Sequence, residues 1–190
     1  MSPIPAFEIG LWNAWIFMLY NFLPMPLLML TRRGAREREQ PARHSQTQKR
    51  LHPVMWVIWL LTFAYSIFLP LQLGTMWFCI GLPISIVGAI AFTMVIVTFA
   101  ITPIDDEPLT RGLYRYSRHP MYVTQLVMFT GVGIASASWV FLLFSTVYAV
   151  LSFVHAIPEE RLCLDKYGDA YREYLNRTPR WIGIPKSGGK

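Results

Sequence analysis

The sequence predicts an all-α polytopic membrane protein with five transmembrane helices, the last two forming a helical hairpin, and a cytoplasmic amphipathic helix at the C-terminal end. Of its 190 residues, 54% are hydrophobic and 15% are charged, a more apolar balance than soluble domains have. Several apolar runs reach the roughly 20 helical residues that cross a bilayer. We therefore expect residues 1–190 to form a single integral membrane domain.

The charges give the expected orientation. All 17 Lys and Arg residues lie in three polar stretches, at 31–52, at 102–119 and after residue 158. Placing these stretches in the cytoplasm satisfies the positive-inside rule and leaves the N-terminus outside. The first stretch is expected to attract anionic membrane lipids, and its position between two spans argues against a nucleic-acid site. No GxxxG motif marks a dimer face, so the sequence leaves the oligomeric state open.

The central motif of the sequence is the run GLYRYSRHPMY, residues 112–122. Three spans are expected before it, at 9–30, 53–73 and 76–101. Little more than Gly74 and Thr75 separates the last two, so they are expected to pack as an antiparallel hairpin. Apart from one tyrosine and one cysteine, these two spans contain no ionisable side chain. That composition disfavours a proton or ion pathway, and with it a channel or pump.

Segment 102–119 is expected on the cytoplasmic side and contains the first eight residues of the central motif. Pro120 suits the first turn of the helix that follows, because its missing N–H is no loss there. Arg118 and His119 then lie beside the positive end of the helix dipole, which favours a bound anion. The alternative interpretation is that the arginines are flanking charges and the tyrosines an interfacial belt.

Residues 120–157 are expected to form the helical hairpin. They contain no Lys, Arg, Asp or Glu, and the small residues SAS divide them at 136–138. Pro158, followed by two glutamates, predicts the start of a separate C-terminal helix over 158–178. This helix has one aromatic face, interrupted at Gly168, where a bend is expected.

The two polar clusters are expected to meet. The C-terminal helix begins on the same side of the membrane as the central motif, so Glu159 and Glu160 can face Arg118 and His119 across a cytoplasmic pocket. The alternative interpretation is an amphipathic helix that only lies on the membrane or on the helical bundle.

The pattern EPLTRGLYRYSRHPMY, an uncharged hairpin and then HAIPEERLCLDKYGDAYREY resembles the isoprenylcysteine carboxyl methyltransferase family and the related phospholipid methyltransferases. The resemblance covers about the last 85 residues, and its specific part is the combination of RHPxY, EExxL and YGxxY. It implies an integral membrane enzyme that uses S-adenosylmethionine. It also implies a cofactor pocket open to the cytosol and a lateral opening for a lipophilic acceptor, either a small molecule or a lipid.

The resemblance also implies which residues do this work. The implied cofactor-binding residues are Pro108, Leu109, Thr110, Tyr114, His119, Pro120, Met121, Tyr122 and Glu159. Their chemistry suits the cofactor, because a carboxylate accepts both ribose hydroxyls, aromatic rings stack on adenine and donors near a helix start hold a carboxylate. Arg118, His155 and Glu160 are expected to shape the acceptor site and to carry any catalytic role.

Two departures from the family pattern bear on the acceptor. His155 stands where the carboxyl methyltransferases carry an arginine that holds the acceptor's carboxylate, and Glu107 stands where they carry a histidine. A neutral imidazole does not replace a bidentate guanidinium, which disfavours an isoprenylcysteine carboxylate as the acceptor. His155 is either a general base for an acceptor that loses a proton or a histidine hydrogen-bonded between helices.

Other functions stay open. A phospholipid N-methyltransferase fits the same motifs, and the acceptor and the site of methylation (O, N or S) are left undecided. Cys163 with DKYG is similar to the tail of sterol-reductase-like NADPH enzymes. A metal site is not expected, because Pro158 should break the helical register between His155 and Glu159. A non-enzymatic membrane scaffold would explain the spans alone.

Overall fold

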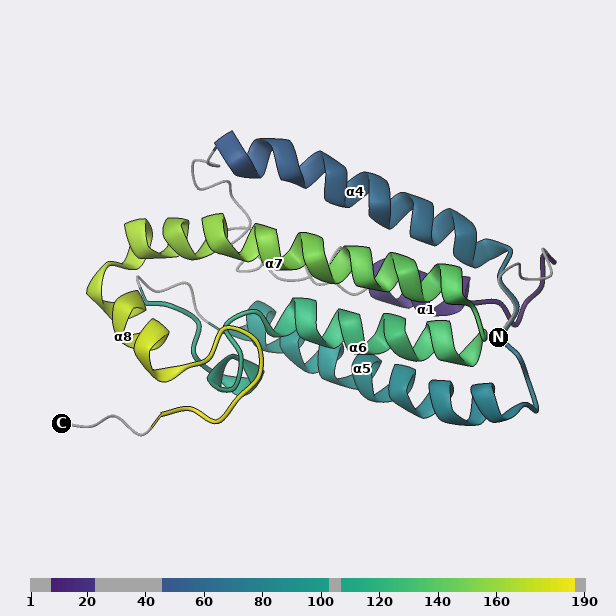
Figure 1. The fold of residues 1–190 in the computed structure, drawn as a ribbon. Helices are drawn as coiled ribbons and strands as arrows, with labels where there is room; N and C mark the ends of the chain where they lie inside the picture. The colour runs from purple at the N-terminus through teal and green to yellow at the C-terminus, as the bar shows by residue number, and fades with distance from the viewer. Residues whose placement is uncertain (1–7, 23–45, 103–106, 187–190) are drawn as a thin grey trace.

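The structure is a computed structural model that describes residues 8–22, 46–102 and 107–186, with side chains of the second stretch described from His52 onward. In these residues the regular structure is helical (Figure 1). The helices are α1 (Trp15–Phe22), α4 (Gln46–Ile67), α5 (Met76–Ile101), the short 3-10 helix η1 (Gly112–Arg115), α6 (Pro120–Ala135), α7 (Trp139–Tyr167) and α8 (Asp169–Arg177). The all-α prediction is confirmed for this part of the chain.

Two of the described helices, α5 and α7, are long and apolar enough to cross a membrane. Shorter apolar helical stretches lie at His52–Ile67 and Pro120–Ala135. Of the first expected span, 9–30, the structure describes residues 9–22, in which helix α1 begins only at Trp15, six residues after the predicted start; residues 23–30 lie outside the described part. The number of five spans and the orientation therefore stay predictions.

Helices α5 and α6 are in close contact along glycine-rich faces. A Cβ atom added at Gly81 would lie 2.2 Å from the backbone nitrogen of Ala135, and one added at Gly131 would lie 2.4 Å from the backbone nitrogen of Ser85. Small residues let helix backbones approach this closely in membranes, where dispersion contacts drive helix association. The tight contact fixes α6, whose first turn carries the last three residues of the central motif, against α5.

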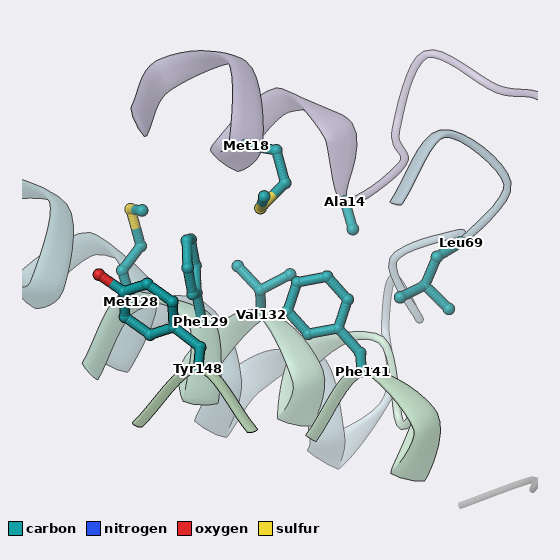
Figure 2. Packing of buried hydrophobic residues seen from close by; sticks show 8 residues of the cluster. All are labelled: Ala14, Met18, Leu69, Met128, Phe129, Val132, Phe141 and Tyr148. Atoms are coloured by element: carbon teal, nitrogen blue, oxygen red, sulfur yellow. The ribbon is translucent and has the colours of Figure 1, made fainter. Parts of the chain in front are cut away.

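The hydrophobic core joins α1, the connection after α4, α6 and α7 (Figure 2). The ring of Phe129 on α6 lies edge-on to the rings of Phe141 and Tyr148 on α7, with centroids 6.4 and 5.4 Å away. The buried cluster consists of Ala14, Met18, Leu69, Met128, Phe129, Val132, Phe141 and Tyr148. This packing holds α7 alongside α6, and so sets where the polar end of α7 meets the central motif.

The expected hairpin of the second and third spans is wrong. Helix α4 lies on α7 and α1, whereas α5 lies on α6, so α4 and α5 are at opposite sides of the bundle (Figure 1). Helix α4 ends at Ile67, short of the predicted end at Leu73. The following residues instead pair with the chain before α1, where the Ala14 N–H donates to the Leu69 carbonyl over 2.9 Å. Pro70, which lacks an N–H, lies in that paired stretch.

Pro158 does not begin a separate helix, contrary to the sequence prediction. Helix α7 runs without interruption from Trp139 to Tyr167, with Pro158 inside it. A proline removes only one backbone hydrogen bond, and the well-packed turns on both sides keep the helix going. The predicted interruption at Gly168 is confirmed, because its φ of 54° ends α7 and starts α8. Glycine adopts this left-handed conformation without the steric cost that a Cβ brings.

The C-terminal tail folds back along the central motif. The Arg118 N–H donates to the Pro179 carbonyl over 3.0 Å, and the Gly183 N–H donates to the Tyr116 carbonyl over 3.1 Å. The Lys186 N–H donates to the Arg177 carbonyl at the end of α8 over 2.8 Å. The tail therefore forms one wall of the region that the central motif and α7 share.

Candidate functional site

Glu160 is the centre of a buried ion cluster. Its carboxylate accepts hydrogen bonds from Nε and Nη2 of Arg180 over 3.0 and 2.7 Å. Arg118 Nη1 lies 3.4 Å away and His119 Nε2 lies 3.2 Å away. The Glu160 side chain is only 7% exposed, so its charge is neutralised by partners instead of by water. This cluster joins α7, the central motif and the tail.

Glu159, the preceding residue, has a different environment. Its Oε2 accepts a hydrogen bond from the Tyr122 hydroxyl over 3.1 Å and lies 3.6 Å from His119 Nδ1 and 3.8 Å from His155 Nδ1. The Glu159 side chain is 41% exposed, and no arginine or lysine pairs with it among the described residues. It is a carboxylate held in place by weak donors and open to solvent, so it can accept hydrogen bonds from a ligand.

Aromatic rings surround the two glutamates. The His119 ring stacks on Tyr122 with centroids 5.7 Å apart and lies 5.8 Å from the Trp181 ring of the tail. Trp181 in turn contacts Phe153 of α7, with ring centroids 4.0 Å apart. The Tyr122 hydroxyl is also 2.9 Å from His155 Nδ1. The site therefore combines an accessible carboxylate with flat apolar faces.

Polar groups continue from this site into the core. Gln125, one turn along α6 from Tyr122, donates to Asn21 of α1 over 2.9 Å and accepts a hydrogen bond from the hydroxyl of Tyr148 on α7. Asn21 and Tyr148 are both buried. Buried polar side chains inside a membrane bundle usually face its interior and pair with one another, as these do.

The segment before the central motif borders a different space. Pro108 and Thr110 line a cavity of about 510 Å³ together with Arg115, residues of α8 and the tail. Tyr174 of α8 also lines it and donates from its hydroxyl to the Tyr114 carbonyl over 2.7 Å. Burial raises the pKa of the Tyr174 phenol, with the nearby Arg118 opposing the shift, so the phenol stays a donor at neutral pH.

The structure brings most of the predicted site residues together. His119, Tyr122 and Glu159 are in contact, and the three predicted acceptor-site residues, Arg118, His155 and Glu160, lie around them. Pro120 is in the first turn of α6 with His119 at its N-cap, as the sequence predicts, and Met121 follows half-buried in the same turn. By contrast, Pro108 and Thr110 line the separate cavity, with Leu109 half-buried between them.

The continuity of α7 at Pro158 removes the reason for not expecting a metal site between His155 and Glu159. Because α7 is continuous, His155 and Glu159 do keep the helical spacing of four residues, with 3.8 Å between Nδ1 and Oε2. The reason given from the sequence is therefore wrong. Within the described residues, no group of three or more His, Cys, Asp or Glu side chains has an arrangement that could hold a metal ion.

Two residues of the cluster were missed by sequence reasoning, Arg180 and Trp181. Arg180 makes the closest ion pair with Glu160, and this pairing raises the pKa of the Arg180 guanidinium. Both residues come after the last helix, in the run TPRW, where no helical periodicity links them to Glu160. The sequence did contain one indication, because an arginine and a tryptophan stand next to each other between two prolines of the tail.

Comparisons with known proteins agree with this arrangement. The phospholipid methyltransferase family matches residues 69–170, slightly more than half of the chain, and this range includes the central motif and both glutamates. Methanethiol S-methyltransferase 1 of Bradyrhizobium diazoefficiens is 38% identical over 70 residues, which are 37% of this chain. The matched region is 24% of the length of that relative. The resemblance predicted from the motifs is thus confirmed, and the chain belongs to the phospholipid methyltransferase family.

Proposed function

We propose that this protein is an S-adenosylmethionine-dependent methyltransferase that acts on a lipophilic acceptor at the cytoplasmic surface of the membrane, in the manner of isoprenylcysteine carboxyl methyltransferases. The proposal rests on the different environments of the two adjacent glutamates. Glu160 is neutralised within the protein, whereas Glu159 is 41% exposed beside aromatic rings. An ordered, accessible carboxylate of this kind is what the ribose hydroxyls of a nucleoside cofactor require.

The surrounding residues fit the rest of the cofactor. The rings of His119, Tyr122 and Trp181 offer flat faces for an adenine base. Arg118 Nε is buried and has no hydrogen-bond partner among the described side chains and backbone, so it is a donor that an anionic group can satisfy. The methionine part of the cofactor carries a carboxylate. Bound S-adenosylmethionine would supply a methyl group on a positively charged sulfur, the group that the acceptor attacks.

The protein's own contribution would be alignment and exclusion of water. Methyl transfer is a displacement, so the acceptor atom must lie in line with the carbon–sulfur bond, and holding two reactants in this way is a large part of catalysis. The rigid contact of α6 with α5 fixes Tyr122, and the cluster of Glu160 with Arg180 fixes the end of α7 and the tail. No covalent intermediate with the protein is needed.

The acceptor is proposed only as a class. The family is named for phospholipid methylation, and the curated relative is named for methylation of methanethiol, a small thiol. His155 in place of an arginine favours an uncharged acceptor atom over a carboxylate. We therefore favour an acceptor with a thiol or an amine on an apolar body, such as a lipophilic thiol or a phospholipid amine. The membrane helices would let it approach from the bilayer.

Calorimetry of the purified protein with S-adenosylmethionine tests the proposal. We expect saturable binding that falls at least tenfold in Glu159→Gln, because the neutral amide loses the charge-assisted hydrogen bonds to the ribose. The matched control is Asp169→Asn on α8, whose side chain is 94% exposed and pairs with Arg172. Undiminished affinity in Glu159→Gln, or binding of NADPH in place of S-adenosylmethionine, would refute the proposal.

The acceptor class is tested by incubating membranes that contain the protein with methyl-labelled cofactor and separating the lipids by chromatography. Label in a thioether or in a methylated amine headgroup decides between the two acceptor classes. Membranes with Glu159→Gln are the negative control. Equal labelling by the variant would show that the transfer does not use this site.

A further inference from the structure

A second histidine lies beside His155, on a different helix. His52 is in α4, and its ring centroid is 6.3 Å from that of His155 on α7. It is equally far, 6.3 Å, from the ring of Trp56 one turn further along α4. Helix α4 packs along α7 (Figure 1). The ring contact shows that the two histidines meet between these helices. Neither the family motifs nor the sequence pattern linked His52 to the site.

The three histidines of this region differ in access to water. His119 is 5% exposed, and its two ring nitrogens each lie next to a glutamate. His155 is 9% exposed, and its Nδ1 lies 2.9 Å from the Tyr122 hydroxyl. His52 is exposed. A group that takes a proton in every turnover must return it to water, and His52 is the most exposed of these three histidines.

We propose that His52 is the general base of the methyl transfer, and this rests on the proposed function. A thiol or amine acceptor carries a proton that must leave. The acceptor's heteroatom gives that proton to a ring nitrogen of His52 and forms its new bond to the methyl carbon with its lone pair. The electrons of the broken carbon–sulfur bond stay on the sulfur of the departing cofactor. His52 then releases the proton to water, which restores the neutral imidazole.

The neighbours of His52 suit this role. It contacts the ring of His155, whose Nδ1 lies 3.8 Å from Oε2 of Glu159, so a carboxylate lies near this pair and would stabilise the imidazolium that forms. The Tyr122 hydroxyl donates to Glu159, so its oxygen can accept a hydrogen bond from His155 Nδ1. His155 is thus a positioning residue, held by Tyr122 beside His52.

Nuclear magnetic resonance tests the pairing without requiring activity. The chain has four histidines, so ring-labelled full-length protein gives four assignable signals. In His52→Gln we expect the ring signals of His155 to shift, because the two rings lie 6.3 Å apart, whereas in a variant of the distant Glu173 they should stay in place. Unchanged His155 signals in His52→Gln would overturn the inference.

Methyl transfer to a long-chain alkanethiol tests the chemical role. In His52→Ala we expect the rate at neutral pH to fall at least a hundredfold, a typical contribution of a general base, with affinity for S-adenosylmethionine retained. Free imidazole should restore part of the rate, because the position is exposed. An unchanged rate, or a loss that imidazole does not restore, would overturn the role of His52. Absence of transfer by the unaltered protein to any thiol or amine would instead refute the proposed function.

Discussion

Replacing Glu160 by glutamine should destabilise the protein more than any other single exchange of charge at the site. The change keeps the volume of the side chain but removes the charge that neutralises Arg118 and Arg180. Arg118 is 11% exposed and would remain as a buried cation without its closest partner. Arg180 is 39% exposed, so solvent would screen most of the free-energy cost of leaving its charge unpaired. Leaving a fully buried charge unpaired costs about 3–5 kcal/mol, and with this screening we expect about 2–3 kcal/mol for Glu160→Gln.

The assay is equilibrium unfolding in detergent micelles followed by circular dichroism, together with limited proteolysis of the tail. In Glu160→Gln we also expect faster cleavage after Arg180, because the tail loses its ion pair with α7. The control is Glu173→Gln, an exposed carboxylate paired with Arg177, for which the change should stay within about 0.5 kcal/mol. Equal stability and equal tail protection in the two variants would refute the view that Glu160 holds this region together.

Four further exchanges can be measured in the same unfolding assay. Gly131→Ala should cost about 1–3 kcal/mol, because the new methyl meets the rigid backbone of α5, whereas Gly133→Ala should cost less, since it meets mainly the movable side chain of Leu142. A larger loss at Gly133 would contradict this account. Tyr174→Phe should cost about 1 kcal/mol through loss of the hydrogen bond from its hydroxyl to the Tyr114 carbonyl. Ser138→Ala should cost about 1 kcal/mol by removing the N-cap of α7, and a neutral effect would show that this helix end has another donor or acceptor in place.

Local signals predicted some elements well. Helix α5 has the predicted bounds, Met76–Ile101. Thr75 caps its start, and the long uncharged run that follows marks the extent of the helix. The division at 136–138 is also as predicted, since Ser136 ends α6 and Ser138 caps α7. The position of Pro120 in the first turn of α6 follows directly from proline geometry.

Long-range packing limited the prediction elsewhere. The short separation of Gly74 and Thr75 suggested a hairpin, but pairing of residues 12–14 with 69–71 takes up the end of the expected second span. Likewise Pro158 has a strong local preference for a helix start, and the continuous packing of α7 overrides it. The partner of Glu160 lies 20 residues further along the chain, beyond any helical periodicity that a sequence pattern could report.

The continuity of α7 explains why two adjacent glutamates do different work. Successive residues of an α-helix point about 100° apart, so Glu159 and Glu160 share His119 as a neighbour but otherwise face different partners. Had a new helix started at Pro158, its first turn could have directed both acids toward one pocket. Instead the helix directs Glu160 to the arginines of the motif and the tail, and Glu159 to Tyr122 and His155. Binding and stability should therefore separate by position, with Glu159→Gln affecting the cofactor and Glu160→Gln affecting the fold.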